Sequence, residues 1–451
     1  MCHDKRMHDD PRNLLADILK QARTQGADAV DLIFRREESR SARVRLGKVE
    51  SIDAAETAQL GIRLFVGKQQ AFAATTDFSQ AACSALIDRA LKMAQLAPAD
   101  PFCGLADLGQ IVSTPRSLDI FDPSESSAPE LVDLARETEA AALAVPGVTN
   151  TEEAEAGWGR SALYLLQSNG FSGHYRRSHF AASVAAVAGK DTAMERDYDY
   201  SSAVYRTDLL PAAVVGSKAG ARAVRRLGAR KMPTGKIPVV FEPRIATSFL
   251  GHLISAINGA SIARRTSFLH GDLGKQVFPA GFSIIDDPHR PRGLRSRPFD
   301  VEGIATAPRQ LVADGVLATW LLDLRSARQL GMASTGHASR SASSPPGAGA
   351  SNCYIGAGKI SPVNLMQDIR EGFYVTELIG MGVNGITGDY SRGASGFWIE
   401  NGQITHPVNE MTIAGNLRDM FGHMTAADDL VLRLEREAPT LRIDGMTVAG
   451  L

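Results

Sequence analysis

A histidine on a predicted helix is the first place in this sequence where metal chemistry could occur. The segment TSFLGHLISAINGASIARR, Thr247–Arg265, has the apolar spacing of an amphipathic helix and carries His252. A catalytic zinc ion usually needs three protein ligands, and two of them often lie one turn apart on a helix. The residues one turn from His252 are Ser248 and Ala256, and no glutamate is adjacent. We therefore expect His252 to be a core or interface histidine with hydrogen-bonded ring nitrogens.

A second histidine, His270, lies two residues before Asp272 on a predicted loop. Such a pair could bind a metal ion, but the sequence offers no third donor beside it. Both are therefore expected to be solvated turn residues. The other histidines of the C-terminal half occur singly, at positions His289, His337, His406 and His423.

Two further segments match the sequence motifs of functional sites, but the residues around them do not fit those sites. Gly380, Gly382 and Gly385 fit G-x-G-x-x-G, but a dinucleotide site needs a helix to begin there, and the following ITGDYSRGASGF is typical of turns and strand. The basic segment HRPRGLRSRP, His289–Pro298, lacks interleaved aromatic residues, so we expect a solvated loop rather than a phosphate site. No G-x-S-x-G motif occurs, which leaves nucleophilic catalysis without support.

The overall composition limits the classes of function. The chain has 451 residues, enough for about two to four domains. Its 49 Lys and Arg residues balance 50 Asp and Glu residues, so the net charge of −1 creates no field that favours nucleic acid or an anionic membrane. Four dispersed cysteines, an N-terminus without a signal-peptide core and no apolar run of about 18 residues indicate a soluble, reduced, cytoplasmic protein.

The elements that would position these residues are short strands mixed with a few helices. Glycine turns at Gly47-Lys48, Gly67-Lys68 and Asn169-Gly170 predict antiparallel hairpins. Apolar periodicity predicts helices near residues 11–26, 79–96, 127–145 and 208–227. Because strands and helices do not alternate as βαβ units, we predict an α+β fold, with an N-terminal mixed helix/antiparallel-sheet domain followed by a large β-rich C-terminal domain.

Changes in this pattern divide the chain into three units. The expected boundaries are 1–115, 116–230 and 231–451, with the first two units packed together as one N-terminal domain. A segment rich in Ser, Gly and Pro, residues 333–352, contains little apolar surface and is expected to be mobile.

The C-terminal third carries a long and specific motif. The segment VTELIGMGVNGITGDYSRGASGFWIENGQITHPVNEMTIAGNLRDMF, Val375–Phe421, closely resembles the C-terminal signature of the PmbA, or TldE, branch of the TldD/PmbA family. STGHASR, SNCYIGAG and VESIDAAETAQLGIRLFVGKQQAFAATTD resemble the same branch. The resemblance therefore spans almost the whole chain.

This resemblance implies a subunit of a cytoplasmic, heterodimeric zinc peptidase, in which TldD holds the metal and TldE helps to enclose peptide substrates. TldD carries His-Glu-x-x-x-His on a helix and a cysteine near its C-terminus. When that helix is anchored on Arg264–Ser267, its His, Glu and His fall on Leu250, Gly251 and Ser255, and no cysteine follows Cys353. The resemblance thus implies no catalytic residue and no metal ligand in this chain, and zinc in a TldD-like partner.

Three functions remain open at this point. The first is a non-catalytic TldE-like subunit that binds unfolded or extended peptides beside a TldD-like peptidase. The second is a stand-alone homodimeric, peptide-binding or chaperone-like protein; the family's older description as a modulator of DNA gyrase would then reflect an indirect effect without DNA contact. The third is autonomous hydrolysis. Candidates for a substrate groove are His252, Tyr390, Arg392 and Trp398.

Overall fold

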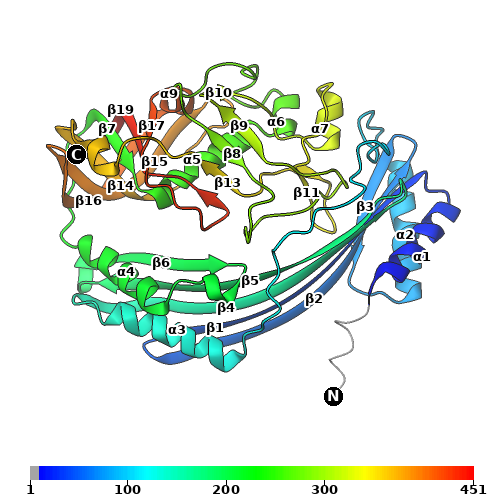
Figure 1. The fold of residues 1–451 in the computed structure, drawn as a ribbon, viewed down its shortest axis with the longest axis horizontal. Coiled ribbons are helices and arrows are strands. Elements are labelled where there is room, and N and C mark those ends of the chain that lie inside the picture. The colour runs from blue at the N-terminus through cyan, green and yellow to red at the C-terminus, as the bar shows by residue number, and fades with distance from the viewer. Residues whose placement is uncertain (1–9, 451) are drawn as a thin grey trace.

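A long curved sheet lies beneath a β-rich C-terminal domain in this protein (Figure 1). The computed structural model describes residues 10–450. The sheet has six antiparallel strands in the order β3-β2-β1-β4-β5-β6. They are β1 (Ala29–Arg45), β2 (Lys48–Val66), β3 (Gln69–Thr75), β4 (Val148–Gln167), β5 (Ser172–Ala188) and β6 (Glu195–Ala203). The three predicted hairpins are confirmed: Gly47, Gly67 and Gly170 occupy their turns with positive φ.

Helices cover one face of this sheet at both of its ends (Figure 1). They are α1 (Arg12–Thr24), α2 (Gln80–Leu96), α3 (Ala128–Leu143) and α4 (Ala212–Arg225), close to the predicted positions. In β1, Leu32 packs in the cluster under α1 and α2, and Val44 packs under α3. Because side chains alternate along a strand, residues of odd number, such as Ile33, face the C-terminal domain instead.

The C-terminal domain contains a small closed barrel and a second sheet. The barrel strands are β7 (Gly235–Phe241), β14 (Glu371–Ile379), β15 (Asp389–Glu400), β16 (Gln403–Asn416), β17 (Met424–Ala426) and β19 (Leu441–Ala449). Their order is β16-β15-β14-β7-β19-β17, and β16 also pairs with β19, which closes the barrel. The predicted α+β fold with a β-rich C-terminal domain is confirmed.

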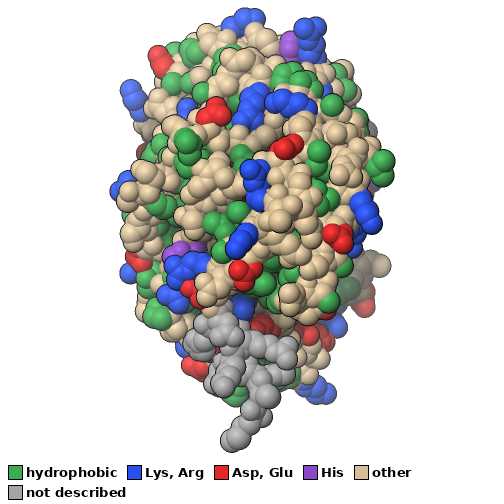
Figure 2. Space-filling view, turned by 90° about the vertical axis from the view of Figure 1, so that its right-hand side faces the viewer, with side chains coloured by type: hydrophobic (Ala, Val, Ile, Leu, Met, Phe, Trp, Pro, Cys, Tyr) green, Lys and Arg blue, Asp and Glu red, His purple; other side chains and the backbone are tan. Residues whose placement is uncertain are grey.

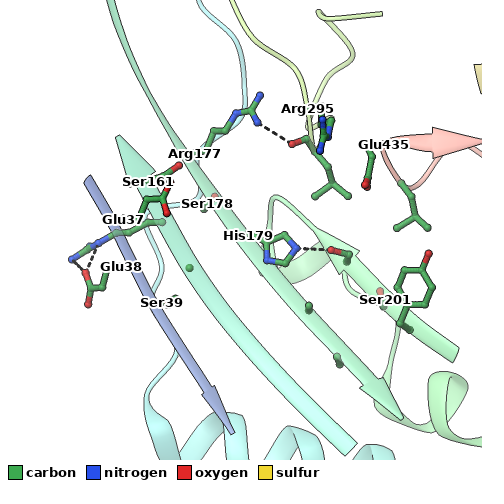
Figure 3. Close-up of a pocket in the computed structure, with 18 of the residues that line it drawn as sticks. Glu37, Glu38, Ser39, Ser161, Arg177, Ser178, His179, Ser201, Arg295 and Glu435 are labelled. Carbon is green, nitrogen blue, oxygen red and sulfur yellow. Dashed lines mark hydrogen bonds and ion pairs between the residues drawn. The ribbon is translucent and has the colours of Figure 1, made fainter. Parts of the chain in front are cut away.

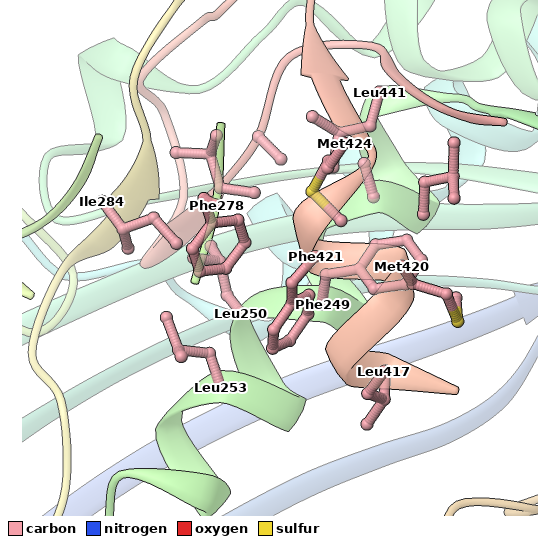
Figure 4. Packing of buried hydrophobic residues seen from close by; sticks show 14 of the residues in the cluster. Phe249, Leu250, Leu253, Phe278, Ile284, Leu417, Met420, Phe421, Met424 and Leu441 are labelled. Carbon is pink, nitrogen blue, oxygen red and sulfur yellow. The ribbon is translucent and has the colours of Figure 1, made fainter. Parts of the chain in front are cut away.

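The second sheet of this domain has the order β10-β9-β8-β13-β18. Its strands are β8 (Ile284–Asp286), β9 (Arg309–Ala313), β10 (Val316–Leu317), β13 (Cys353–Ile355) and β18 (Arg436–Glu437). Other short elements of this domain are β11 (Ala338–Ser339), β12 (Gly347–Ala348), α7 (Leu324–Gln329), α8 (Pro362–Met366) and α9 (Leu417–Gly422). One hydrophobic core joins the two sheets, and Figure 4 shows Phe249 and Leu253 packing there with Phe278 and Phe421.

The helix predicted over residues 247–265 is two helices. α5 (Pro243–Ala256) ends where Asn258 begins α6 (Gly259–Ala263). The Asn258 side chain accepts a hydrogen bond from the Ala260 amide (3.1 Å) and donates one to the Ala348 carbonyl (2.8 Å). Asparagine is a favoured N-cap residue, so the capping interaction and the tertiary bond together explain the break.

Much of the segment 333–352 is buried, so the expectation that it has too little apolar surface to pack is wrong. His337, Ala338 and Ala342 are buried, and the two alanines pack in a cluster with Ile33 of the long sheet and Phe299 of the C-terminal domain. Arg340 forms an ion pair with Asp31 of β1. Polar tertiary contacts replace the apolar surface that this segment lacks, and composition alone does not reveal them.

Charged side chains of both signs are spread over the surface (Figure 2), in keeping with the balanced composition. On the face seen in Figure 2, hydrophobic side chains are dispersed among side chains of both charges. Cys83, Cys103 and Cys353 are free and buried, whereas Cys2 lies outside the described residues. No helix within residues 10–450 combines the length and the apolar character that crossing a lipid bilayer requires.

Candidate functional site

The inner face of the long sheet forms the floor of a cavity (Figure 3). Along β4, Trp158 faces the helices, so Gly159 on the next position faces inward. Gly159 lies between Ser39 of β1 and His179 of β5 in the strand register. Ser39, Gly159 and Ser161 have small side chains, so they leave space between the sheet and the C-terminal domain.

The C-terminal domain supplies the opposite wall. Leu294 and Arg295 reach the cavity from the loop between β8 and β9, and Leu434 and Glu435 reach it from the segment before β18. The volume of this cavity is about 870 Å³. This volume lies within the range of ligand-binding clefts in proteins.

Two smaller cavities adjoin this one and extend it along the interface. A cavity of about 420 Å³ shares the wall residues Glu37, Ser161, Arg177, Leu294 and Arg295. A cavity of about 640 Å³ shares the wall residues Tyr200, Leu434 and Glu435 and reaches α5 at Arg244 and Thr247. Together the three cavities form a groove between the long sheet and the C-terminal domain, which we call the interdomain groove.

Ion pairs and hydrogen bonds hold the polar side chains of the floor in place. Glu38 pairs with Arg40 and Arg160, at 2.7 Å in each case. His179 Nε2 lies 2.6 Å from Ser202 Oγ, and enclosure by the cavity walls lowers the pKa of His179. His179 is therefore neutral near pH 7 and offers a ligand a hydrogen bond rather than a charge.

The helix that the resemblance aligns with a zinc helix has no ligand on the aligned positions. Leu250 is buried in the core, and Ser255 is exposed. A side chain at Gly251 would lie 3.6 Å from Arg436 Nη1. This face of α5 therefore meets a cation of β18.

Three of the four predicted groove residues form a cluster that lies apart from the interdomain groove. The rings of His252 and Tyr390 are 5.8 Å apart, and His252 Nε2 and the Tyr390 hydroxyl have no hydrogen-bond partner among residues 10–450. Burial and the nearby Arg392 lower the pKa of His252 to about 4. Trp398 is only 4% exposed and belongs to the core. None of the four lines the three cavities described above.

The His270 and Asp272 pair lies in a structured turn. The Asp272 side chain is buried and pairs with Arg418 at 2.6 Å and with Lys275 at 3.4 Å. The expectation that Asp272 is solvated is therefore wrong, because two cations already neutralise its carboxylate.

The glycine motif at Gly380 forms a turn, as the sequence context predicts. β14 ends at Ile379 and β15 begins at Asp389, with no helix between them. The phosphate-binding helix N-terminus of a dinucleotide site is therefore absent at this described segment.

The basic segment 289–298 is part of the groove wall, and the expectation of a solvated loop is wrong. Arg290 donates to the Leu434 carbonyl at 2.5 Å. Arg297 donates to the carbonyls of Ala338 and Gly349 at 3.2 and 3.0 Å. Backbone acceptors from two distant segments, the one before β18 and residues 333–352, thus hold this loop in place.

Comparison with known proteins places the whole chain in one family. Three family models match it: PmbA/TldA metallopeptidase domain 1 over residues 30–94, the central domain over 121–227 and the C-terminal domain over 234–450. The chain belongs to the PmbA/TldD metallopeptidase family. The metalloprotease PmbA of Escherichia coli O157:H7 is 38% identical over 91% of this chain and 90% of its own length. A PmbA homolog of Haemophilus influenzae is 35% identical, again over 91% and 90%.

Solved structures of this family have the same fold. A Bacteroides thetaiotaomicron protein described as a modulator of DNA gyrase superposes with a TM-score of 0.90 at 26% identity, over 99% of this chain and 100% of its own. TldE of Thermococcus kodakarensis superposes with a TM-score of 0.87 at 20% identity, over 97% of this chain and 100% of its own. At that identity, the second likeness concerns the fold alone.

The family's description as metallopeptidases implies a metal ion, which the described donors of this chain do not fit. Across residues 10–450, no group of three His, Cys, Asp or Glu side chains comes together as a metal site would require. At Gly251 the nearest side-chain group is the Arg436 guanidinium, which would repel a metal cation. We therefore derive no chemical step through a metal on this chain.

The inward residues of the floor were not predicted from the sequence, although a signal for them exists. In β4, Gly157, Gly159 and Ser161 alternate with the bulkier Trp158 and Arg160. This period of two, with small residues on one face, indicates a strand with an open inner surface. What lies above that surface comes from segments more than 100 residues away and is not written in the pattern.

Proposed function

We propose that this chain is a PmbA/TldE-like subunit that lacks zinc ligands of its own and pairs with a TldD-like zinc peptidase. In that complex it helps to enclose and bind unfolded or extended peptides for proteolysis or peptide maturation. The observation that carries the proposal is the interdomain groove, which combines a floor of small residues with polar walls. Zinc and the hydrolytic step belong to the partner.

An extended peptide suits the shape and chemistry of this groove. Its main chain needs a surface that allows close approach, and Ser39, Gly159 and Ala181 supply one. Polar floor groups such as His179 and Ser202 supply hydrogen bonds to a peptide. A folded domain would not fit a cavity of about 870 Å³.

A free strand edge supports pairing with a second chain. β3 pairs with β2 only from Leu60 onward, so residues 48–59 of β2 have β1 on one side and no strand of residues 10–450 on the other. Val49 and Ile52 on this edge are 39% and 52% exposed. Exposed apolar residues on an unpaired edge favour association with another chain.

The proposal is tested by preparing the chain alone and after co-expression with a TldD-like partner. Each preparation is analysed for zinc and for cleavage of casein or an unfolded peptide. We expect co-purification, zinc in the complex, no stoichiometric zinc in the lone chain and cleavage only by the complex. About one zinc per chain in the lone protein, with cleavage abolished by His252→Ala or His270→Ala, would overturn the proposal.

A substitution in the floor tests the groove itself. Ser161→Trp places a bulky ring in the cavity and should lower peptide cleavage by the complex without changing its zinc content. Ser172→Trp, on an exposed position of β5 outside the three cavities, is the matched control. If the chain never co-purifies with a TldD-like partner but sediments as a dimer and binds peptides, the stand-alone homodimeric peptide-binding or chaperone-like function replaces the first.

A further inference from the structure

Four arginines surround the smaller cavity of about 420 Å³ at one end of the interdomain groove. Arg35 comes from β1, Arg177 from β5, and Arg295 and Arg297 from the loop between β8 and β9. Figure 3 shows Arg177 reaching from the sheet toward this loop, with Arg295 beside it. Residues from three distant parts of the chain thus bring like charges together.

Backbone carbonyls hold three of these guanidinium groups in place. Arg35 donates to the Arg340 carbonyl at 2.7 Å, and Arg177 donates to the Leu294 carbonyl at 3.1 Å and to the Ser296 carbonyl. Arg297 is held in the same way, by the two carbonyls described above. A carbonyl carries only a partial negative charge, so these bonds fix the side chains without neutralising them.

None of the four arginines forms an ion pair with an acidic side chain within residues 10–450. The Nε atoms of Arg35, Arg177 and Arg297 are buried and have no hydrogen-bond partner in this part of the chain. Arg340, which is more deeply buried, pairs with Asp31. What distinguishes this cavity is that four arginines without an ion pair line the same space.

The cavity wall also has two acidic groups, Glu37 and Asp300, and neither forms an ion pair with the four arginines within residues 10–450. Asp300 is fully buried and accepts hydrogen bonds from three backbone amides, those of Glu302, Ile304 and Ala338. Burial and the charges of Arg297, Arg295 and Arg35 lower the pKa of Arg177, as expected where cations repel each other in a partly desolvated site.

We propose that this cavity is a binding site for a carboxylate, and that it selects an acidic residue or the C-terminus of a peptide bound in the interdomain groove. Guanidinium groups bind carboxylates through paired N–H···O bonds, and an anion would offset the repulsion among the four arginines. The selectivity for peptides rests on the proposed function.

The cavity is open to the groove on the side where a peptide would lie. Its walls and those of the 870 Å³ cavity share Ser161 on the floor and Arg295 on the roof. A main chain lying over Gly159 and Ser161 would therefore have the arginine-lined cavity within reach of a side chain.

The first experiment uses glutarate, a dicarboxylate, with its uncharged diamide as the comparison at matched ionic strength. Calorimetric titration of the full-length chain should show saturable binding of glutarate at one site and none of the diamide. Arg295→Gln should weaken glutarate binding by about tenfold or more, which is the effect of losing one charged hydrogen-bonding partner. Arg295 is exposed, and its guanidinium forms no hydrogen bond or ion pair with residues 10–450, so this variant should fold.

Arg176→Gln is the matched control, because Arg176 is adjacent to Arg177 but points to the other face of the sheet, over the Phe121 ring. It removes the same charge and should leave glutarate affinity unchanged. Arg35→Gln serves as a second cavity variant, with cooperative unfolding as the check on its fold. Absence of saturable glutarate binding, or equal losses in Arg295→Gln and Arg176→Gln, would overturn the carboxylate site.

The second experiment distinguishes the sources of the carboxylate with three labelled extended peptides of one sequence. One has a central Glu and an amidated C-terminus, one a central Gln and an amidated C-terminus, and one a central Gln and a free C-terminus. Binding is measured by fluorescence anisotropy. Tighter binding of the first peptide indicates that the site takes an acidic side chain, and tighter binding of the third indicates that it takes a C-terminus. Equal binding of all three overturns the peptide selectivity. If no peptide binds but glutarate does, peptide binding by this chain fails while the carboxylate site stands.

Discussion

Arg340 Nη2 lies 2.9 Å from Asp31 Oδ1, in an ion pair that joins the C-terminal domain to the long N-terminal sheet. Both side chains are fully enclosed. Asp31 lies near the start of β1, and Arg340 lies in a segment whose composition resembles that of a linker. The pair fixes this segment as a structural wall between the two domains.

Removing one partner of this pair should be costly. Arg340→Ala leaves the Asp31 carboxylate buried without a counter-charge, and we expect a loss of about 3–5 kcal/mol in the free energy of unfolding, measured with urea. Arg43→Ala is the control, because Arg43 pairs with Glu153 and Glu155 at an exposed position and should cost less than about 1 kcal/mol. Equal losses in the two variants would show that the buried pair has no special role.

Glu302 should make the protein less stable as the pH rises. Burial, with a further contribution from Asp300, raises the pKa of Glu302 to about 8, above its ordinary 4.5. The folded state then holds a proton that the unfolded state has released, so stability falls between about pH 5 and pH 8, by at most about 1.4 kcal/mol per pH unit. Glu302→Gln should flatten this slope in urea unfolding at several pH values. Parallel profiles for the two proteins would contradict the assignment.

His252 should have the opposite effect at lower pH. Its pKa is lowered to about 4, so between pH 6.5 and pH 4 the unfolded state binds a proton that the folded state does not. Stability is therefore lost as the pH falls through this window. His252→Phe fits beside Phe249 and Tyr390 and should make the protein more resistant to acid than the wild type. An unchanged midpoint of acid unfolding would be evidence against a neutral, desolvated imidazole.

Gly61 should be essential for the seating of the segment 333–352. A Cβ atom at Gly61 of β2 would lie 2.0 Å from the Ala342 carbonyl oxygen, so Gly61→Ala must displace the segment or the strand. We expect a loss of about 2 kcal/mol or more and faster proteolysis within 333–352. Gly157→Ala on β4 is the control, because its nearest contact would be an ordinary 3.8 Å. Cleavage at the same rate in both variants would show that the segment tolerates the displacement.

Much of the fold follows from local patterns. The hairpin glycines and the apolar spacing of α1 to α4 act over a few residues, so the sequence predicts them directly. At Ser127 the capping box is visible in the letters, and the structure has it: Ser127 Oγ accepts from the Glu130 amide, and the Glu130 side chain accepts from the Ser127 amide. The break between α5 and α6 at Asn258 does not follow from local spacing alone, because a hydrogen bond to the distant Ala348 carbonyl contributes to it.

The candidate site depended far more on tertiary contacts. The sequence singled out His252, Tyr390, Arg392 and Trp398, all within the C-terminal domain. The interdomain groove instead takes its floor from β1, β4 and β5 and its roof from loops more than 100 residues later. The basic segment 289–298 is visible in the sequence, but its place in the groove wall depends on distant residues such as Leu434 and Gly349.

By itself, the sequence determined the family, the α+β class, the hairpins and the absence of ligand types on the aligned positions of α5, because these depend on residue identity and short-range spacing. Only the tertiary structure decided that a polar segment is buried beside Asp31 and that Arg35, Arg177, Arg295 and Arg297 share one cavity. The reason is physical: burial and the meeting of like charges depend on which distant segments pack together, and that is a property of the whole chain.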